Sequence, residues 1–189
     1  MKVYEIIFSP TGGTKRVADF LCNSFTEKIN LIDITDSNVD FCRIGLVQED
    51  VAVIAVPSYG GRVHTTAVER LTQIHGNGAR AILVCVYGNR AFDDTLVELE
   101  DAAKQAGLCI IAGVAAIAEH SIARQFATGR PDEKDAQQLR LFGQQIQKKL
   151  FDSDESQPRL LGNRPYKKAN GAGMVPNATK DCVKCGTCA

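Results

Sequence analysis

A short segment near the N-terminus combines the residue types that hold a phosphate group. Residues 9–14 read Ser-Pro-Thr-Gly-Gly-Thr, with three hydroxyl side chains and two adjacent glycines. The segment joins an apolar run to an amphipathic one, so we expect it at the start of a helix, where free backbone N–H groups attract anions. It contains neither G-x-x-x-x-G-K-[ST] nor G-x-G-x-x-G. The residues suit one terminal phosphate monoester, and a hydroxyl-capped helix without a ligand is the alternative.

Two further loops place glycines beside aromatic and charged side chains. Residues 59–62 (Tyr-Gly-Gly-Arg) follow the apolar run 51–56, and residues 87–94 (Tyr-Gly-Asn-Arg-Ala-Phe-Asp-Asp) follow the run 81–87. The carboxyl ends of parallel strands meet at one edge of a sheet, and ligands of open α/β sheets bind there. We therefore expect both loops to lie beside residues 9–14.

The seven cysteines are unevenly distributed along the chain. Cys182, Cys185 and Cys188 lie within the last eight residues, in the pattern CVKCGTC. Clustered thiols without a secretory signal indicate a metal site rather than a disulfide framework. The remaining four cysteines are scattered, and we expect them to be buried, unreactive thiols; they are Cys22, Cys42, Cys85 and Cys109.

Strand and helix patterns alternate along most of the chain. Short apolar runs predict five strands, at residues 3–8, 31–34, 51–56, 81–87 and 108–116. Helical spacing of apolar residues predicts helices at 14–28, 66–75, 95–105 and from Asp132 to about residue 150. The runs 51–56 and 81–87 have no polar face, so both faces of the sheet must be covered. The sequence therefore predicts an α/β doubly wound sheet of five parallel strands.

Residues 1–150 resemble the flavodoxins. Segment 9–14 matches the [S/T]-x-T-G-x-T phosphate loop of that family at every fixed position and lies between the first strand and the first helix. The resemblance implies a flavodoxin-like three-layer sandwich with strand order 2-1-3-4-5 and bound FMN. It also implies a set of cofactor-binding residues: Ser9, Thr11, Gly12, Gly13, Thr14, Ser58, Tyr59, Gly60, Gly61, Arg62, Tyr87, Gly88, Asn89, Phe92 and Asp93.

A flavin ring calls for an aromatic stacking partner and for adaptable backbone near its N5 atom. Tyr59 and Phe92 are the candidates for stacking, and Tyr87 is a weaker one because it could still lie in the strand. Gly60 or Gly61 could turn a carbonyl toward N5–H of a half-reduced flavin.

The charged side chains of these loops leave alternatives open. Arg62 and Arg90 could each contact the ring or be solvated loop charges. His64 is expected to cap or pack locally rather than to act in catalysis. Asp93 and Asp94 are candidates for a helix cap first and for a ligand contact second.

The C-terminal cysteines resemble a second family, the bacterial ferredoxins. Residues 181–189, DCVKCGTCA, reproduce the opening of C-x₂-C-x₂-C-x₃-C-P, which holds [4Fe–4S] clusters. The fourth cysteine is missing, so the resemblance implies a truncated ferredoxin domain at 179–189, joined to the flavodoxin-like domain by a linker or extension at 151–178. The cluster is then expected in the full-length protein only. A three-thiolate zinc site completed by a partner and a metal-free tail are the alternatives.

Composition and charge exclude several classes of protein. The chain has 22 basic and 22 acidic residues, and this neutrality argues against a general nucleic-acid binder. Its apolar runs are too short to cross a bilayer, and the N-terminus lacks a cleavage site, so we expect a cytoplasmic protein without a membrane partner. Residues 158–189 carry a net charge of +5 and the rest −5. The basic tail could dock on the body, dock on an acidic partner, or be a solvated linker.

The leading functional hypothesis is an FMN-binding electron-transfer flavoprotein. In the full-length protein it would relay electrons between flavin and iron–sulfur clusters, with a redox partner protein or its own ferredoxin domain as the partner. An FMN-dependent NAD(P)H reductase of quinones, flavins or small electrophiles is the alternative, so whether the chain is an enzyme stays open. A docking module without FMN is the third hypothesis.

Residues 118–132 could form a lid or a partner surface, and the oligomeric state is not determined.

Overall fold

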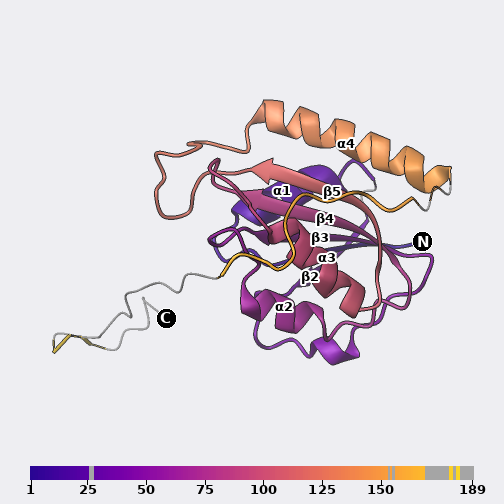
Figure 1. The fold of residues 1–189 in the computed structure, drawn as a ribbon, viewed down its shortest axis with the longest axis horizontal. Coiled ribbons are helices and arrows are strands. Elements are labelled where there is room, and N and C mark those ends of the chain that lie inside the picture. Colours follow the sequence, from indigo (N-terminus) through magenta and orange to yellow (C-terminus); the bar gives the residue numbers. More distant parts are fainter. Residues whose placement is uncertain (26–27, 153, 155, 169–178, 181, 184–189) are drawn as a thin grey trace.

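A parallel sheet of five strands forms the centre of the molecule (Figure 1). The computed structural model describes residues 1–25, 28–152, 154, 156–168, 179–180 and 182–183. In this part of the chain the strand order is β2-β1-β3-β4-β5, and every neighbouring pair is parallel. The strands are β1 (Val3–Ile7), β2 (Ile29–Asp33), β3 (Val51–Pro57), β4 (Arg80–Tyr87) and β5 (Cys109–Ile117). The predicted sheet and its strand order are confirmed.

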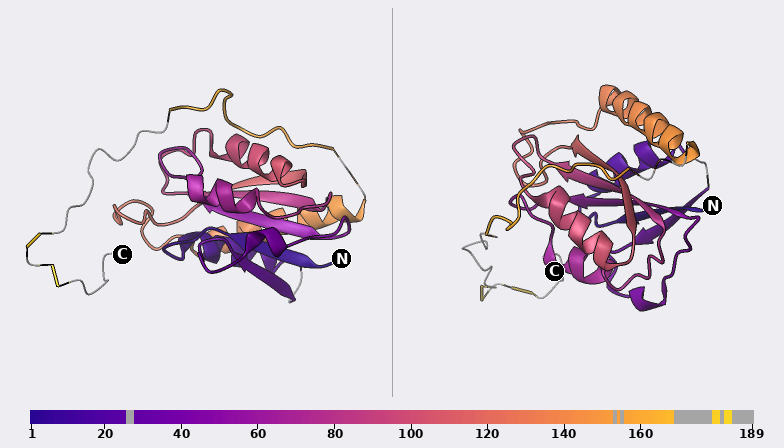
Figure 2. Two further views of the ribbon diagram at one scale, coloured as in Figure 1. Left: turned by 90° about the horizontal axis from the view of Figure 1, so that it is seen from below. Right: turned by 45° about the vertical axis from the view of Figure 1, so that its right-hand side comes forward.

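Helices cover both faces of the sheet and complete three layers (Figure 2). The helices are α1 (Gly13–Cys22), α2 (Thr65–Leu71), α3 (Thr95–Gln105) and α4 (Glu133–Phe151), with a 3₁₀ turn η1 (Phe41–Arg43). Helices α1 and α4 pack against one face of the sheet, and α2 and α3 pack against the other. This arrangement brings the loops that follow β1, β3 and β4 to one edge of the sheet.

Alternating side chains of the central strand β3 fill two separate hydrophobic cores. Ala52, Ile54 and Val56 lie in the core beneath α2 and α3, whereas Val51 and Val53 lie in the core beneath α1 and α4. All of these side chains are fully buried. Successive side chains of a strand point to opposite faces, which explains why an unbroken apolar run is found where both faces are covered.

The observed helices differ from the predicted ones mainly at their C-termini. Helix α1 ends at Cys22 rather than near Lys28, because Asn23 and Ser24 turn the chain and the Ser24 hydroxyl donates to the Leu21 carbonyl oxygen at 2.6 Å. Helix α2 likewise ends at Leu71 and not at His75.

The start of α4 agrees with the prediction from Asp132. The Asp132 carboxylate accepts hydrogen bonds from the backbone N–H groups of Lys134 and Asp135, and the Asp135 carboxylate accepts one from the N–H of Asp132. This reciprocal pair satisfies N–H groups that a helix start leaves without partners.

The expectation of four buried cysteines outside the tail is half wrong. Cys22 and Cys85 are buried, and burial raises the pKa of both thiols, that of Cys85 to about 12. Cys42 and Cys109 are exposed. Cys42 lies in the surface turn η1, and Cys109 opens the edge strand β5, so neither position has a covering layer over its side chain.

The chain after α4 returns across the molecule instead of leaving it. Residues 156–168 run over β5 and α3 toward the edge of the sheet where the β3 and β4 strands end (Figures 1 and 2). Leu160 packs against the core beneath α3, and Arg164 forms ion pairs with Glu100 and Asp101 of that helix. For residues 158–168 of the basic tail, the structure thus agrees with the first alternative, docking on the acidic body.

No helix in the described part of the chain is both long and apolar enough to span a membrane.

Candidate functional site

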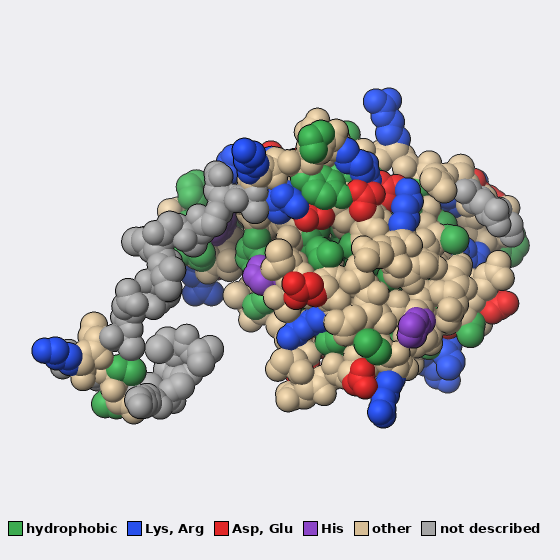
Figure 3. Space-filling model, turned by 60° about the horizontal axis from the view of Figure 1, so that its bottom comes forward, with side chains coloured by type: hydrophobic (Ala, Val, Ile, Leu, Met, Phe, Trp, Pro, Cys, Tyr) green, Lys and Arg blue, Asp and Glu red, His purple; other side chains and the backbone are tan. Residues whose placement is uncertain are grey.

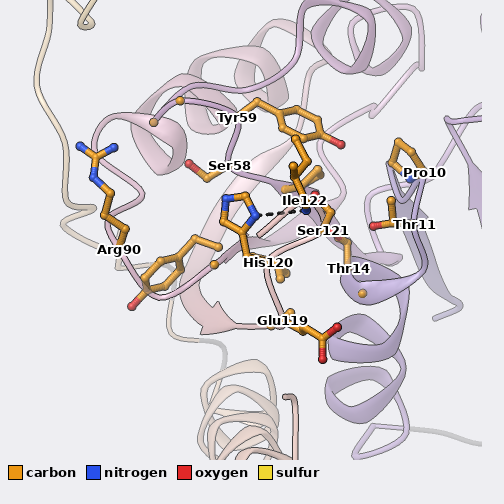
Figure 4. A pocket seen from close by; sticks show the side chains of 18 of the residues that line it. Pro10, Thr11, Thr14, Ser58, Tyr59, Arg90, Glu119, His120, Ser121 and Ile122 are labelled. Carbon is orange, nitrogen blue, oxygen red and sulfur yellow. Dashed lines mark hydrogen bonds between the residues drawn. The ribbon is translucent and has the colours of Figure 1, made fainter. Parts of the chain in front are cut away.

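A cavity of about 270 Å³ lies at the carboxyl ends of the strands (Figure 4). Its walls come from the loops after β1, β3, β4 and β5, which the topology brings together although they are far apart in the sequence. The lining residues are Pro10, Thr11, Gly13, Thr14, Pro57, Ser58, Tyr59, Gly60, Gly61, Val86, Tyr87, Gly88, Arg90, Ala91, Ala118, Glu119, His120, Ser121 and Ile122.

The first turn of α1 presents hydrogen-bond donors without acceptors. Gly12 is the N-cap residue, with φ of +83°, and has no side chain to cap the helix. The backbone N–H groups of Thr11, Gly13 and Thr14 have no hydrogen-bond acceptor among the described residues. No acidic side chain lies in this turn, so the partial positive charge of the helix N-terminus is not neutralised there. The loop is therefore prepared for an anion.

Ser9 holds this loop in shape through three hydrogen bonds. Its hydroxyl oxygen accepts a hydrogen bond from the N–H of Lys15 at 3.0 Å, and its own N–H donates to the Thr35 hydroxyl at 2.7 Å. The Ser9 carbonyl oxygen accepts the N–H of Gly12. These bonds tie the loop to the helix and to the end of β2, so the donors of the first turn are held in place.

A tight turn after β3 holds an aromatic ring at the mouth of the cavity. The N–H groups and carbonyl oxygens of Tyr59 and Arg62 exchange hydrogen bonds of 2.9 and 3.1 Å. Gly60 and Gly61 between them have φ of +60° and +84°, a conformation in which glycine avoids the penalty of a side chain. The Tyr59 ring contacts the His64 ring edge-on and remains 39% exposed. The ring lines the cavity and is available for stacking.

The loops after β3 and β4 are bonded to each other. The N–H of Asp94 donates to the Gly61 carbonyl oxygen at 3.0 Å, and the hydroxyls of Ser58 and Thr95 lie 2.7 Å apart. A Cβ atom at Gly61 would lie 2.3 Å from the Asp93 carboxylate, so only glycine fits there. The two loops therefore form one unit.

The loop after β4 supplies the opposite wall. Tyr87 and Phe92 contact each other edge-on, with ring centroids 5.3 Å apart, and Phe92 packs toward the core beneath α3 rather than into the cavity. Gly88 allows His120 to approach closely, because a Cβ there would lie 2.6 Å from the His120 ring. Asn89 has φ of +64° and does not line the cavity.

His120 and its neighbours are a part of the site that the sequence analysis did not name. The His120 Nδ1 atom accepts hydrogen bonds from the N–H groups of Ile122 and Ala123, at 3.2 and 3.0 Å (Figure 4). A neutral imidazole in this arrangement carries its proton on Nε2. The side chain of Ile122 is 88% exposed beside the cavity. The only signal in the sequence was the length of the connection 118–132, which is unusual between adjacent elements.

No family model and no curated protein matches the sequence. Solved structures do match. A flavodoxin from Streptococcus pneumoniae TIGR4 is 18% identical, with a TM-score of 0.51, over 78% of this chain and 99% of that one. Fusobacterium nucleatum flavodoxin bound to flavin mononucleotide is 14% identical, with a TM-score of 0.51, over 79% and 99% of the chains. Rubredoxin oxygen:oxidoreductase from Desulfovibrio gigas is 15% identical, with a TM-score of 0.55, over 80% of this chain and 36% of that one.

The chain has a flavodoxin-like fold. Of the fifteen residues proposed to bind the cofactor, the cavity of this flavodoxin-like fold is lined by nine: Thr11, Gly13, Thr14, Ser58, Tyr59, Gly60, Gly61, Tyr87 and Gly88. The other six lie outside the lining: Ser9, Gly12, Arg62, Asn89, Phe92 and Asp93. Ser9 and Gly12 still shape the phosphate loop, so they remain part of its architecture.

Arg62 and Asp93 face away from the cavity because each has a charged partner elsewhere. The Arg62 guanidinium donates two hydrogen bonds to the Glu98 carboxylate, at 2.7 and 2.6 Å, and a third to the Lys167 carbonyl oxygen at 2.7 Å. The Asp93 carboxylate pairs with the Lys167 ammonium at 2.7 Å. Both side chains therefore hold the loops in this structure, and their contact with the cofactor stays a prediction.

Of the two residues His64 and Asp94, only His64 caps a helix with its side chain. His64 caps α2, since its Nδ1 accepts the N–H of Thr66 at 3.2 Å, as predicted. Asp94 stands at the N-cap position of α3, but its carboxylate does not cap that helix. It accepts backbone N–H groups of Asn163 and Lys167 instead, and these bonds lower its pKa.

A buried carboxyl group lies beneath α1. Glu5 on β1 is 2% exposed, and its Oε1 atom has no hydrogen-bond partner among the described residues. Burial, and then the nearby Asp19 carboxylate, raise the pKa of Glu5 to about 7. Asp19 also pairs with the Lys15 ammonium at 2.6 Å, so this cluster adjoins the helix that begins at the phosphate loop.

The proposed metal site falls mostly outside the described residues. Of Cys182, Cys185 and Cys188, the structure describes Cys182 alone, as an exposed free thiol. Within the described residues, no group of three His, Cys, Asp or Glu side chains is arranged to hold a metal ion.

Proposed function

We propose that this cavity binds FMN and that the chain is an electron-transfer flavoprotein. The observation that carries the proposal is the set of free N–H donors at the start of α1, in the same cavity as the Thr11 and Thr14 side chains and the partly exposed ring of Tyr59. A phosphate dianion satisfies such donors, and an aromatic face suits a flat ring. The match to a flavodoxin bound to flavin mononucleotide supports this choice of ligand.

The residues present fit FMN. The N–H groups of Thr11, Gly13 and Thr14 would bind the phosphate, and Tyr59 would stack on the ring. The cavity volume of about 270 Å³ lies just below the usual range of about 300–1,000 Å³ for small-molecule sites, so part of the ring would stay near the surface. Bound FMN supplies the redox chemistry, accepting one or two electrons, and the protein supplies binding and electrostatics.

A titration of FMN into flavin-free protein, followed by flavin fluorescence, tests the proposal. We expect quenching that saturates at one FMN per chain. Riboflavin, which lacks the phosphate, should bind much more weakly, because the donors of the α1 turn would stay unsatisfied. Equal affinity for both compounds, or no binding of FMN, would contradict the proposal.

A reductase of quinones, flavins or small electrophiles is the second candidate. It is favoured by His120, which lines the cavity and whose Nε2–H could donate a hydrogen bond to the oxygen of a substrate reduced there. Steady-state oxidation of NADH or NADPH with a quinone acceptor distinguishes the two functions. A fast turnover rate in the wild type that falls strongly in His120→Gln favours the reductase. A slow rate of flavin reduction that the substitution leaves unchanged favours the carrier.

We further propose that the C-terminal cysteines contribute to an iron–sulfur centre that exchanges electrons with the flavin. The proposal rests on the spacing of Cys182, Cys185 and Cys188, which matches the first three ligands of the ferredoxin pattern. Anaerobic reconstitution of the full-length protein with iron and sulfide tests it. Iron binding should fall in Cys182→Ser but not in Cys109→Ser, which removes another exposed thiol. Equal iron content in both variants would contradict the proposal.

A further inference from the structure

The described stretch 159–168, hereafter the strap, is anchored along α3 by charge and by apolar packing. The Arg164 guanidinium donates to both Asp101 carboxylate oxygens, at 2.8 and 2.7 Å, and to Glu100 at 2.8 Å. The Tyr166 hydroxyl donates to the same Asp101 carboxylate. Leu160 lies so close to Gly113 of β5 that a Cβ atom there would be 2.3 Å from its side chain. The strap is therefore a docked element.

The strap reaches the loop after β4 through two adjacent carboxylates. One oxygen of Asp94 accepts the backbone N–H and the side-chain amide of Asn163, at 2.8 and 3.0 Å. The other oxygen accepts the N–H of Lys167 at 2.7 Å. Asp94 is only 2% exposed, so the strap supplies hydrogen bonds that a buried carboxylate requires. The Lys167 ammonium also pairs with Asp93.

The strap reaches the loop after β3 through Arg62. This guanidinium donates to the Lys167 carbonyl oxygen at 2.7 Å and lies over the Tyr166 ring, 4.8 Å from its centroid. Arg62 is also the last residue of the turn that presents Tyr59, and its backbone bonds directly to Tyr59. Tyr166 and Lys167 of the strap thus both contact Arg62, and the backbone of Arg62 is hydrogen-bonded to Tyr59 in the wall of the cavity.

We propose that the strap is a positioning element of the cavity, so that docking of the strap and binding of FMN strengthen each other. The inference rests on the proposed function, because it names the element that regulates the same site. Arg62, Asp94 and Lys167 are positioning residues in this scheme, since they act through the loops and not on the ligand.

The backbone of these loops gives the physical reason for the coupling. Gly60, Gly61, Asn89 and Asp93 all have positive φ, and for a residue other than glycine this conformation is held only by its surroundings. An undocked strap would remove the partners of the Asp93 and Asp94 carboxylates, and Arg62 would lose its contacts with Tyr166 and Lys167 and keep only Glu98. FMN would then have to order the loops as it binds, which weakens its affinity. By linkage, bound FMN must favour the docked strap by the same factor.

Two arginines of the strap provide a matched test. Arg164→Ala removes the bonds to α3 without touching the cavity, whereas Arg159→Ala removes an exposed side chain that has no hydrogen bond or ion pair among the described residues. We expect Arg164→Ala to weaken FMN binding on the order of fivefold or more, in the usual range of such couplings, and Arg159→Ala to leave it within twofold. Leu160→Ala serves as a second way of loosening the strap.

Hydrogen–deuterium exchange of the flavin-free full chain is the second readout. Arg164→Ala should speed exchange in residues 159–168 and also in 59–63 and 88–94, while β3 and β4 stay protected and show that the fold is intact. In the wild-type chain, saturating FMN should slow exchange in the strap. A strap that loosens in Arg164→Ala and Leu160→Ala while both loops and the FMN affinity stay unchanged would overturn the proposal.

The two proposals fail in distinguishable ways. If the wild-type chain binds no FMN, the proposed function fails, and the exchange of the flavin-free loops still decides the role of the strap. Faster loop exchange in Arg164→Ala then supports the positioning role, and unchanged loop exchange refutes it. If FMN binds with equal affinity to all three variants and the wild type, the function stands and the coupling fails.

Discussion

Thr11 is the residue at which phosphate recognition can be tested most directly. It lines the cavity from an exposed position in the loop before α1, so its loss should leave the fold intact. We predict that Thr11→Ala weakens FMN binding by about 1–3 kcal/mol, because a charged acceptor loses a hydroxyl donor. Thr65→Ala, at the exposed start of α2 and outside the cavity, is the control. Unchanged affinity in Thr11→Ala, measured by fluorescence titration, would remove Thr11 from the site.

Glu5 should make the stability of the protein depend on pH. Its folded pKa of about 7 lies above the ordinary value of 4.5, so its contribution to stability is full below pH 4.5 and is lost as the pH rises through 7. Between pH 5 and 8, we expect the unfolding free energy of the wild type to fall by about 2–3 kcal/mol more than that of Glu5→Gln.

Urea denaturation at the two pH values measures the difference, with Glu69→Gln as a control at an exposed position. An equal pH dependence in the wild type and Glu5→Gln would show that Glu5 is not the group responsible.

At the scale of the element, we predict that alanine at two neighbouring glycines of the turn after β3 destabilises the protein to different extents. Gly60→Ala has open space around the new Cβ and should cost about 1–2 kcal/mol, for its left-handed backbone alone. Gly61→Ala bears the same penalty and also drives a Cβ into Asp93, which Lys167 holds in place, so it should cost about 1–3 kcal/mol more. Urea denaturation of both variants measures the two costs. Equal destabilisation would mean that Asp93 is free to move.

The acidic residues in and before α3 explain why the strap docks beside the cavity. Asp93 and Asp94 precede α3 beside the loops of the site, and Asp93 pairs with Lys167 while Asp94 accepts backbone N–H groups of the strap. Glu100 and Asp101, in the middle of α3, pair with Arg164 of the strap. The space-filling view shows acidic and basic side chains interspersed over this part of the molecule (Figure 3). Charges that would repel an anionic cofactor are therefore largely neutralised within the chain.

At the scale of the whole molecule, this charge balance predicts the redox potential. The net charge is zero, and the cavity wall includes the cationic Arg90. A negative surface disfavours the anionic two-electron-reduced flavin, so we expect a second reduction potential less negative than in flavodoxins with strongly acidic surfaces. Arg90→Gln should shift the potential of bound FMN to a more negative value, and Arg159→Gln should not. A redox titration that gives an equally low potential for the wild type would refute the expectation.

Much of the fold and a large part of the cavity could be predicted from the sequence. The apolar runs and the amphipathic spacing are local patterns, so they indicated the strands, the helices and the edge at which their loops meet. Residues 9–14 and 58–61 line or shape the cavity because each loop directly follows a strand whose position the topology sets. The sequence by itself determined this scaffold.

Only the tertiary structure decided which charged groups meet. Arg62 and Lys167 are 105 residues apart, and no periodic pattern connects them. The sequence therefore placed Arg62 and Asp93 among the candidate cofactor residues and did not indicate that the strap binds both. His120 enters the cavity for a similar reason, because the irregular loop after β5 folds back against Gly88. Local patterns record which segments form elements, whereas ion pairs and loop contacts depend on distances that exist only once those elements have packed.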